Sequence, residues 1–376
     1  MSVYQDRLEE ILDWMVEDEI CLLMFEDSEG RRDSTIRWLT GHPCDALLFL
    51  YLDSEGAGRT LLIPWDVNMA MLHVKVDALI PYGEFGRQPI KALRGAIEFL
   101  KVPYGVKIEI PGTTSYPRFL NFVEEFSDFD IICREGGARA EIEKIRAVKD
   151  EAEIQTYRKI FAMTDEIINL VEKSIRSGKL KTEVDVALFI DCESRKMGCE
   201  GTGFETIAAG PSRSFGIHAF PAYTAEIFGG SGLSILDFGL KYFGYSSDVT
   251  VTFAKEPLSK QQEKMLNLVE KAYSLAISMV KNGVPARSIS AAVESLFARS
   301  KKTMPHALGH GIGLEAHEAP SLRNRADNDW ILQSGMIIAI EPGLYDPVHG
   351  GCRLENDLLV TDTGAEVLTN SKIIRL

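Results

Sequence analysis

The sequence predicts an α+β protein of two domains, a small α/β domain followed by a larger, pseudo-symmetric α+β domain. The chain has 376 residues, which exceeds one ordinary domain and fits two domains of roughly 100–200 residues. Helix and strand patterns alternate in the first part of the chain. The second part repeats one plan, a helix pair followed by a strand-rich stretch, about 105 residues apart. A repeated plan indicates internal pseudo-symmetry.

The composition is that of a globular protein with an acidic surface. Apolar residues make up 45% and charged residues 26% of the chain, which excludes a disordered or collagen-like chain. The formal net charge is −14. A chain this acidic is a poor partner for nucleic acid or an anionic membrane surface, and we expect neither.

The predicted domain boundary falls after Ala138, so that the domains are 1–138 and 139–376. The segment Arg134–Ala140 is polar and contains the Gly136-Gly137 pair, a typical linker signal. The acidic excess is unequal across this boundary. The first part holds 24 acidic and 13 basic residues, a net charge of −11, and the remainder holds 31 and 28, a net charge of −3.

Several features predict a cytoplasmic protein. Met1–Ile20 carries acids through its apolar stretch and has no basic segment before an apolar run, so it does not resemble a signal peptide. The longest uninterrupted apolar run, Ala46–Leu52, is far too short to span a membrane. The six cysteines include no C-x-x-C pair, which favours reduced thiols over disulfides or a thiolate zinc site.

The first domain has the periodicities of a small α/β unit and no chemical motif. We predict helices at Tyr4–Glu17 and Arg94–Leu100, and strands at Ala46–Leu52, Arg59–Pro64 and Gly105–Ile110. The second domain begins with a charged amphipathic helix and continues with three further helices. We predict these helices at Glu151–Ile175, Val184–Lys196, Ser259–Gly283 and Pro285–Lys301, with glycine-rich strand patterns at Phe204–Ala254 and His306–Leu376.

Two aspartates interrupt apolar strands in the second domain. Asp237 lies within Leu233–Gly239, and Asp248 opens the alternating strand Val249–Phe253. The short glycine-containing segment between them predicts a hairpin that returns the second strand beside the first, with both carboxylates at one place. For a single aspartate, a turn or helix-cap role is the simpler alternative.

Two glutamates occupy similar positions further along the chain. Glu341 ends the strand Met336–Glu341, just before Pro342-Gly343, and Glu355 lies on the predicted strand Arg353–Val360. Pairing with Arg353 is the simpler alternative for Glu355.

Three of the seven histidines, His306, His310 and His317, fall within twelve residues. Their spacing fits one face of a helix, but Pro305 and the interleaved glycines favour a tightly turned extended segment. A single histidine is commonly a core residue, whereas three in a glycine-rich stretch indicate a site. No H-E-x-x-H, G-x-S-x-G or phosphate-loop motif is present.

If these acids and one histidine converge, the chemistry is that of a dinuclear metal site. Four carboxylates in one pocket raise each other's pKa unless cations compensate them. Two divalent ions supply the matching charge, and oxygen-rich ligands favour manganese over a thiolate-bound zinc. Such a pair can hold a bridging hydroxide and polarise a carbonyl, which predicts metal-assisted amide hydrolysis.

In order, spacing and flanking residues, this set of motifs resembles the creatinase/aminopeptidase P/prolidase family, the "pita-bread" metallopeptidases. The resemblance is strongest over Phe204–Leu376 and looser towards the amino terminus. The motifs that carry it are Leu236-Asp237-Phe238-Gly239, Ser247-Asp248 to Phe253, Gly309-His310-Gly311, Ile340-Glu341-Pro342-Gly343-Leu344-Tyr345 and Arg353-Leu354-Glu355.

The resemblance implies a creatinase-like amino-terminal domain, a pita-bread catalytic domain and two divalent ions, Mn²⁺ foremost, with Co²⁺, Zn²⁺ or Fe²⁺ as alternatives. The residues at the family's ligand positions are Asp237, Asp248, His310, Glu341 and Glu355. Asp237 would bind one metal, Asp248 and Glu355 would bridge both, and Glu341 would also accept a proton.

The resemblance also implies roles outside the ligand set. His218 and His317 would contact the substrate carbonyl and the scissile bond, and His306 and Tyr345 would line a proline pocket. Arg353 would hold neighbouring carboxylates or the substrate terminus. Ala219 after His218 and Asp346 after Tyr345 depart from the residues commoner in the family.

The implied activity is hydrolysis of the Xaa-Pro bond in short peptides by a homodimeric enzyme. The chain lacks the extra length common in the aminopeptidases, which favours an Xaa-Pro dipeptidase over an Xaa-Pro aminopeptidase. A dipeptidase needs a cation for the free carboxylate of its substrate. Arg323 and Arg325 are candidates, and surface charge is their simpler explanation. A non-peptidase hydrolase or lyase and a catalytically silent binding protein are the rival functions on the same scaffold.

Overall fold

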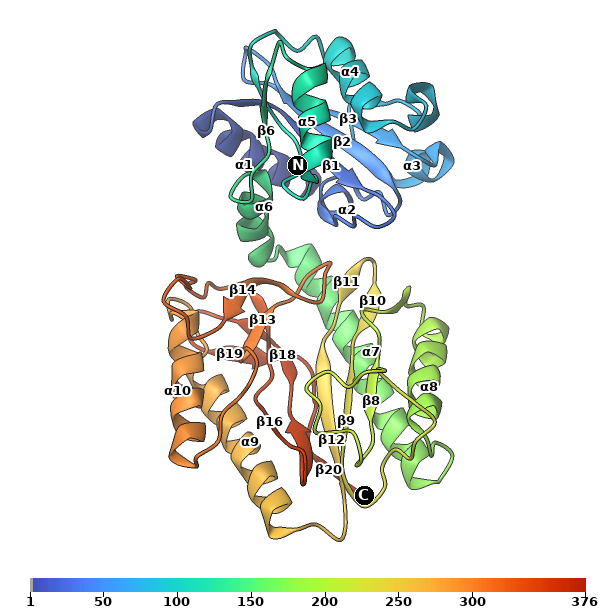
Figure 1. The fold of residues 1–376 in the computed structure, drawn as a ribbon, viewed down its shortest axis with the longest axis vertical. Coiled ribbons are helices and arrows are strands. Elements are labelled where there is room, and N and C mark those ends of the chain that lie inside the picture. Colours follow the sequence, from blue (N-terminus) through green and yellow to red (C-terminus); the bar gives the residue numbers. More distant parts are fainter. Residues whose placement is uncertain (1–2) are drawn as a thin grey trace. The chain divides into compact units, whose positions relative to one another are not determined.

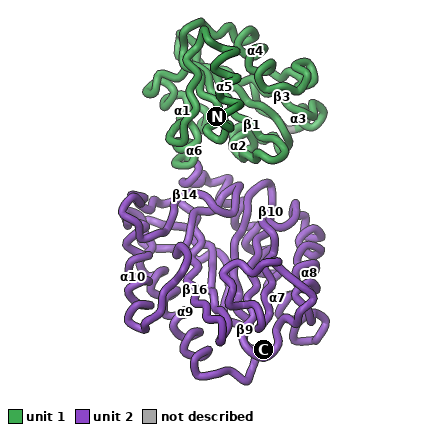
Figure 2. Tube along the Cα trace, in the orientation of Figure 1, with its two compact units in different colours: residues 1–145 green, residues 146–376 purple. Residues whose placement is uncertain are grey.

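The computed structural model describes residues 3–376 and divides the chain into two compact units. Unit 1 is Met1–Ile145 and unit 2 is Arg146–Leu376 (Figure 2). The predicted boundary after Ala138 coincides with the first residue of helix α6, Ala138–Ala147, which continues to the division between the units. Glycines 136 and 137 precede this helix, and the Glu109 carboxylate accepts a hydrogen bond from the Ala138 N–H at its start.

Unit 1 is a mixed sheet with helices packed on it (Figure 1). The strand order is β4-β3-β2-β1-β5-β6, in which β1, β2 and β3 are antiparallel neighbours and the outer pairs are parallel. The strands are β1 (Ile20–Asp27), β2 (Ala46–Leu52), β3 (Gly58–Pro64), β4 (Ala78–Leu79), β5 (Lys107–Glu109) and β6 (Asp130–Ile132). The remaining elements are α1 (Val3–Glu17), α2 (Thr35–Thr40), α3 (Val67–His73), the 3₁₀ helix η1 (Tyr82–Phe85), α4 (Pro89–Leu100) and α5 (Tyr116–Glu125).

Unit 2 consists of two similar halves, each with a helix pair and an antiparallel core of strands (Figure 1). The helices are α7 (Glu151–Arg176), α8 (Glu183–Lys196), α9 (Lys260–Met279) and α10 (Ala286–Arg299). Capping boxes begin three of them, at Asp150, Thr182 and Ser259, where the side chain and the backbone exchange hydrogen bonds. The predicted α9 extends too far, because the chain leaves the helix after Met279 and turns before Gly283.

The two main sheets of unit 2 have the orders β20-β12-β9-β8 and β14-β13-β15-β18-β19, with smaller sheets β11-β10-β7 and β16-β17. The strands of the first half are β7 (Gly201–Thr202), β8 (Ile207–Ala209), β9 (Gly232–Phe238), β10 (Leu240–Tyr242), β11 (Tyr245–Ser246) and β12 (Val249–Lys255). The second half contains β13 (Gly309–Gly311), β14 (Glu318–Leu322), β15 (Ile337–Ile340), β16 (Gly343–Asp346), β17 (Gly350–Arg353), β18 (Asn356–Val360) and β19 (Ala365–Val367). The last strand, β20 (Ile374–Arg375), pairs with β12 in the sheet of the first half.

Two hydrophobic clusters hold the halves of unit 2. One joins α9 and α10 to the second sheet, and the other joins α7 and α8 to the first. The sheets meet where Thr250 of β12 forms an isolated antiparallel bridge with Glu355. This bridge interrupts the strand predicted at Arg353–Val360. The structure instead has β17 ending at Arg353 and β18 beginning at Asn356, so the prediction of one continuous strand was wrong.

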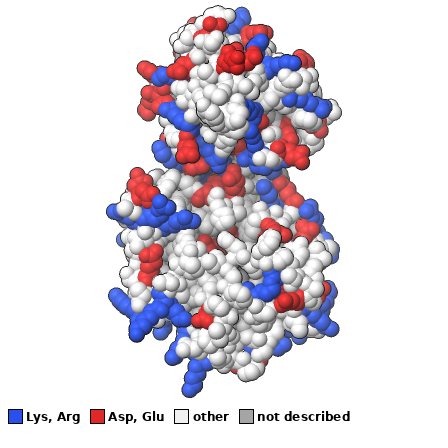
Figure 3. Space-filling model, viewed as in Figure 1, with Lys and Arg blue, Asp and Glu red and all other residues white. Residues whose placement is uncertain are grey.

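Charged groups of both signs cover the visible face of unit 1, whereas unit 2 shows a broad uncharged area (Figure 3). All six cysteines are unpaired. Among the described residues, no helix combines the length and the apolar character needed to cross a bilayer.

The capping box at the start of α9 provides a test of local stability. Ser259→Ala removes the hydroxyl that accepts the Gln262 N–H, and loss of such a cap costs about 1 kcal/mol. We expect a lower midpoint in urea denaturation. Ser274→Ala, which removes an exposed hydroxyl within the same helix, should leave the midpoint nearly unchanged. Equal midpoints for the two variants would contradict the role of the cap.

Candidate metal centre

Five residues from separate strand ends converge in unit 2. Among the described residues, three overlapping sets of potential metal ligands have their oxygen or nitrogen atoms within 4.8 Å of one another. The sets are Asp248 with His310 and His317, His310 with Glu341 and Glu355, and Asp237 with Asp248 and Glu355. The structure thus brings together all five residues predicted as ligands, and it adds His317 to their neighbourhood.

The two aspartates come from the predicted hairpin. Strands β9 and β12 pair antiparallel, with Asp237 opposite Thr250, and Asp248 immediately precedes β12. The backbone N–H of Asp248 donates to Oδ2 of Asp357 at 3.0 Å. This contact fixes the point at which the chain enters the strand.

Strand β13 carries His310 between β14 and β15, and its flanking glycines make this position possible. A methyl group on Gly309 would lie 2.0 Å from the carbonyl oxygen of Ala339, and one on Gly311 would lie 1.8 Å from that of Ala319. Any larger residue would push the strands apart. The extended segment predicted from these glycines is confirmed, and the helical alternative is excluded.

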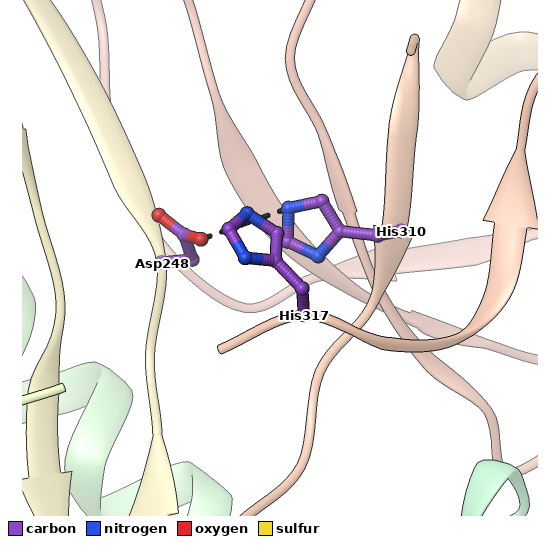
Figure 4. A group of neighbouring side chains, drawn as sticks. All are labelled: Asp248, His310 and His317. Carbon is purple, nitrogen blue, oxygen red and sulfur yellow. Dashed lines mark ion pairs between the residues drawn. The ribbon is translucent and has the colours of Figure 1, made fainter. Parts of the chain in front are cut away.

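Figure 4 shows His310 and His317 beside Asp248. Nε2 of His310 lies 3.6 Å from Oδ2 of Asp248 and 3.8 Å from Oε1 of Glu341, while its Nδ1 lies 3.0 Å from the Gly311 carbonyl oxygen. If Nδ1 carries the proton and donates to this carbonyl, Nε2 is left as a lone-pair donor towards the carboxylates. The His317 ring packs edge-on against His310, with centroids 4.3 Å apart.

Glu341 and Glu355 complete the group. Glu341 follows directly after β15, and its backbone N–H donates to the Leu308 carbonyl at 2.8 Å. Glu355 lies at the bridge to β12, where the Thr250 hydroxyl donates to its Oε2 at 2.7 Å. Both glutamates therefore lie just outside regular strands, Glu341 after β15 and Glu355 between β17 and β18.

Arg353 is a buried cation behind these carboxylates, with 1% of its surface exposed. Its guanidinium donates to the Asp237 carboxylate, to the Thr250 hydroxyl at 2.9 Å, to the Tyr345 hydroxyl at 2.7 Å and to the Ile217 carbonyl at 2.9 Å. The direct ion pair of Arg353 is with Asp237, and Arg353 acts on Glu355 through its charge alone.

A cavity of about 690 Å³ opens in front of the ligand group. His218, His306, His317 and Arg323 line it together with the five candidate ligands. Tyr345 and Arg353 are not among the lining residues. They stand behind the wall, where the Tyr345 hydroxyl lies 2.9 Å from Nε2 of His306.

The pKa shifts in this group favour neutral side chains in the absence of cations. Burial, reinforced by neighbouring carboxylates, raises the pKa of Asp248 and of Glu355 well above the usual range. Burial also raises the pKa of Glu341 to about 8. It lowers the pKa of His310 to about 3 and of His306 to about 4, so both rings are neutral at pH 7.

The donor set fits divalent metal ions. Oδ1 of Asp237 is buried and has no hydrogen-bond partner among the described residues, which is unusual for a carboxylate oxygen and fits coordination of a metal ion. Four carboxylates and one neutral imidazole match the ligand preference of manganese-type ions, and the described cysteines lie outside the group.

Sequence reasoning missed two supporting residues. Thr250 donates to Glu355 and accepts from Arg353, and Asp357 accepts from Asp248. Their positions in the sequence carry a signal, because Thr250 and Asp357 lie two residues beyond the candidate ligands Asp248 and Glu355. Alternate residues of an extended chain share a face.

Comparison with known proteins identifies the family. The profile of Metallopeptidase family M24 matches residues 155–362, more than half of the chain. The chain belongs to this family. M24 membership makes it a hydrolase of the metal-dependent peptidases and confirms the resemblance drawn from the motifs.

Sequence similarity to individual proteins covers more of the chain than the family profile does. The chain is 30% identical over 330 residues to the Xaa-Pro dipeptidase of Pyrococcus furiosus, covering 86% of this chain and 87% of that protein. It is 34% identical over 234 residues to an uncharacterized peptidase of Methanocaldococcus jannaschii, covering 62% of this chain and 66% of that protein, just under two thirds.

The fold agrees with a solved M24-like structure over the whole chain. The crystal structure of X-Pro aminopeptidase from Thermotoga maritima superposes with a TM-score of 0.81 at 24% identity, covering 99% of this chain and all of that one. The predicted α+β pita-bread architecture is thereby confirmed.

The raised pKa of Glu341 predicts a pH-dependent stability in the metal-free M24 chain. A carboxyl with a higher pKa in the folded than in the unfolded state stabilises the fold fully below its unfolded value of 4.5. This contribution is lost as the pH rises through about 8. His306 and His310 are neutral in both states above about pH 7, so they do not oppose this trend.

We therefore expect the melting temperature of EDTA-treated protein to fall between about pH 7 and pH 9 more steeply for wild type than for Glu341→Gln. Saturating Mn²⁺ should flatten the wild-type curve, because cations replace the protons on the carboxylates. Identical slopes for wild type and variant without metal would contradict the assignment.

Proposed function

We propose that the protein hydrolyses the Xaa-Pro bond of dipeptides with the help of two divalent metal ions. The observation that carries this proposal is the convergence of Asp237, Asp248, His310, Glu341 and Glu355 in front of one cavity. Bound at these residues, the ions would balance the carboxylate charge, polarise the peptide carbonyl and lower the pKa of water.

The side chains divide the remaining work. Glu341 lies within the ligand group and lines the cavity, so its carboxylate is placed to accept a proton from the attacking water and pass it on. His218 and His317 line the cavity at exposed positions, where each can donate a hydrogen bond to the substrate carbonyl.

We assign the proposed proline subsite to His306, which lines the cavity, whereas Tyr345 lies behind it and not in the cavity wall as predicted. Nδ1 of His306 lies 2.7 Å from the carbonyl oxygen of Ala307 and its Nε2 meets the Tyr345 hydroxyl, so the ring is held in one orientation. The Arg353 guanidinium restrains the same hydroxyl and the Asp237 carboxylate. We therefore assign Arg353 a positioning role, rather than contact with the substrate.

Arg323 supports a dipeptide substrate. It lines the cavity, whereas Arg325 pairs with Asp327 at 3.0 Å and is not among the lining residues. A dipeptide presents a free carboxylate next to the scissile bond, and a guanidinium binds it well. The relative from Pyrococcus furiosus carries the same activity in its name.

An Xaa-Pro aminopeptidase is the second candidate, because the Thermotoga maritima protein of this fold bears that name. Retention of all five candidate ligands favours a peptidase over a silent binding protein or a non-peptidase hydrolase. We further propose Mn²⁺ as the native metal, because the candidate ligands are rich in oxygen. The family resemblance supports a homodimer. The lack of C-x-x-C pairs supports a cytoplasmic location.

Metal content and activity should depend on the same residues. Elemental analysis of Mn²⁺-loaded protein should find close to two ions per chain. His310→Ala and Glu341→Ala should each lower the metal content and reduce Leu-Pro hydrolysis by at least about 10³-fold, with circular dichroism unchanged. Wild-type protein without bound metal after loading would overturn the proposal.

Arg323 allows a test of substrate length. Arg323→Met should raise the KM for Leu-Pro about 10–100-fold, the loss of one charge-assisted contact, and should leave Leu-Pro amide unaffected. Arg325→Met is the matched control and should behave like wild type. Wild-type turnover of Leu-Pro-Gly but not Leu-Pro would instead establish the aminopeptidase.

A further inference from the structure

The segment 210–224 is an irregular loop that supplies one wall of the cavity. It contains no helix or strand in the structure, yet its ends lie close together, as in an Ω-loop. The residues of this loop that line the cavity are Ile217, His218, Ala219, Phe220 and Ala222. An irregular loop of this length needs specific contacts to hold His218 at the cavity.

The two ends of the loop are joined by one buried carboxylate, that of Glu183. This side chain is fully buried at the first turn of α8. It accepts hydrogen bonds from the Gly210 N–H, the Thr224 N–H and the Thr224 hydroxyl, each at 2.7 Å. Gly210 and Thr224 are the first and last residues of the loop, so Glu183 closes its base.

Arg213 extends this clamp into the loop. Its guanidinium pairs with the Glu183 carboxylate and also donates to the carbonyl of Pro221. A buried carboxylate is costly unless donors and a counter-charge satisfy it, and here both oxygens are satisfied by the loop itself. The negative charge therefore favours the one loop conformation that provides these donors.

Two contacts from the second half of unit 2 hold the middle of the loop. The Ser214 hydroxyl accepts the Gly351 N–H at 3.1 Å, and the Ile217 carbonyl accepts from Arg353 at 2.9 Å. His218 thus lies between two held residues. Arg353 holds Ile217 on one side, and Arg213 holds Pro221 on the other. Its position depends on both anchors.

We propose that Glu183, acting through Arg213, is a positioning residue that sets the placement of His218 at the metal site. The inference rests on the proposed function, in which His218 contacts the substrate carbonyl. Glu183 itself has no place in the cavity wall, so its influence on catalysis passes through the loop. A small displacement of an aligned catalytic group can reduce the rate about 10²-fold.

The test is a double-mutant cycle with Leu-Pro as substrate and Mn²⁺-loaded protein. Glu183→Gln keeps the shape but replaces one acceptor with a donor, and we expect kcat to fall about 10–100-fold, with metal content unchanged. The kcat of His218→Ala should fall by at least the same factor. If Glu183 acts through His218, the double variant should be no slower than His218→Ala alone.

Glu153→Gln is the matched control. Glu153 is also a buried glutamate at a helix start, where its carboxylate accepts from the Asp150 N–H at 3.0 Å and from the Tyr245 hydroxyl at 2.8 Å. Both of these partners lie outside the loop 210–224. The variant should lower the melting temperature and retain wild-type kcat. Fully multiplicative losses for Glu183→Gln and His218→Ala would overturn the proposal.

Amide hydrogen exchange separates the clamp from the proposed activity. Glu183→Gln should accelerate amide exchange in residues 211–223 at least about 10-fold and leave the strands β9 and β12 protected. If Glu183→Gln does not fold, the milder variant Arg213→Met takes its place, with the same expected result. Unchanged exchange in this loop would overturn the clamp. Accelerated exchange with a fully active His218→Ala would refute the assigned role of His218, while the clamp would stand.

Discussion

The site is organised around one buried cation, the guanidinium of Arg353, among carboxylates. Four carboxylates in a single cavity repel one another, and Arg353 offsets part of this charge from behind the cavity wall. Removing a guanidinium from water is costly unless its donors are satisfied. Its donors reach Asp237, Thr250, Tyr345 and the Ile217 carbonyl. These partners belong to β9, β12, β16 and the loop 210–224, so satisfying one charge fixes four segments of the chain.

The fold places the site where regular strands end. The helix pairs α7–α8 and α9–α10 bury one face of each sheet, and the opposite faces approach at the Thr250–Glu355 bridge. Carboxylates at this junction are shielded from water, which strengthens every charge interaction among them. The glycines beside His310 permit a third strand to enter the same crowded space. Strands position the candidate metal ligands, whereas the loop 210–224 supplies part of the cavity wall.

The sequence was most informative where signals are local. The boundaries predicted for α7 and α8 agree with the structure within a few residues. Capping boxes and the 3.6-residue period involve residues that are close in the sequence, so they can be recognised there. The order of the motifs predicted the candidate ligands that the structure brings together. It did not predict the partners of Arg353 and Glu355, because Thr250 and Asp237 lie more than 100 residues away in the chain. Short strands such as β4 and β6 were missed, because a few residues carry too little periodicity to be distinguished from loops.

The same distinction explains why residue type alone does not identify the supporting residues of the site. The side chains that bind divalent metals at an oxygen-rich site are mainly carboxylates and imidazoles, so their residue type indicates their chemistry. A residue that orients a ligand needs only a hydrogen-bonding group at the right place, which Thr250, Asp357 and Glu183 provide with ordinary side chains. Glu183 would be counted as a helix-start acid, since carboxylates are common in the first turn. Only its contacts with Gly210 and Thr224 reveal that it closes a loop at the cavity. The arrangement of the candidate site therefore depends on buried polar contacts. These are recognised from three-dimensional proximity and not from residue type.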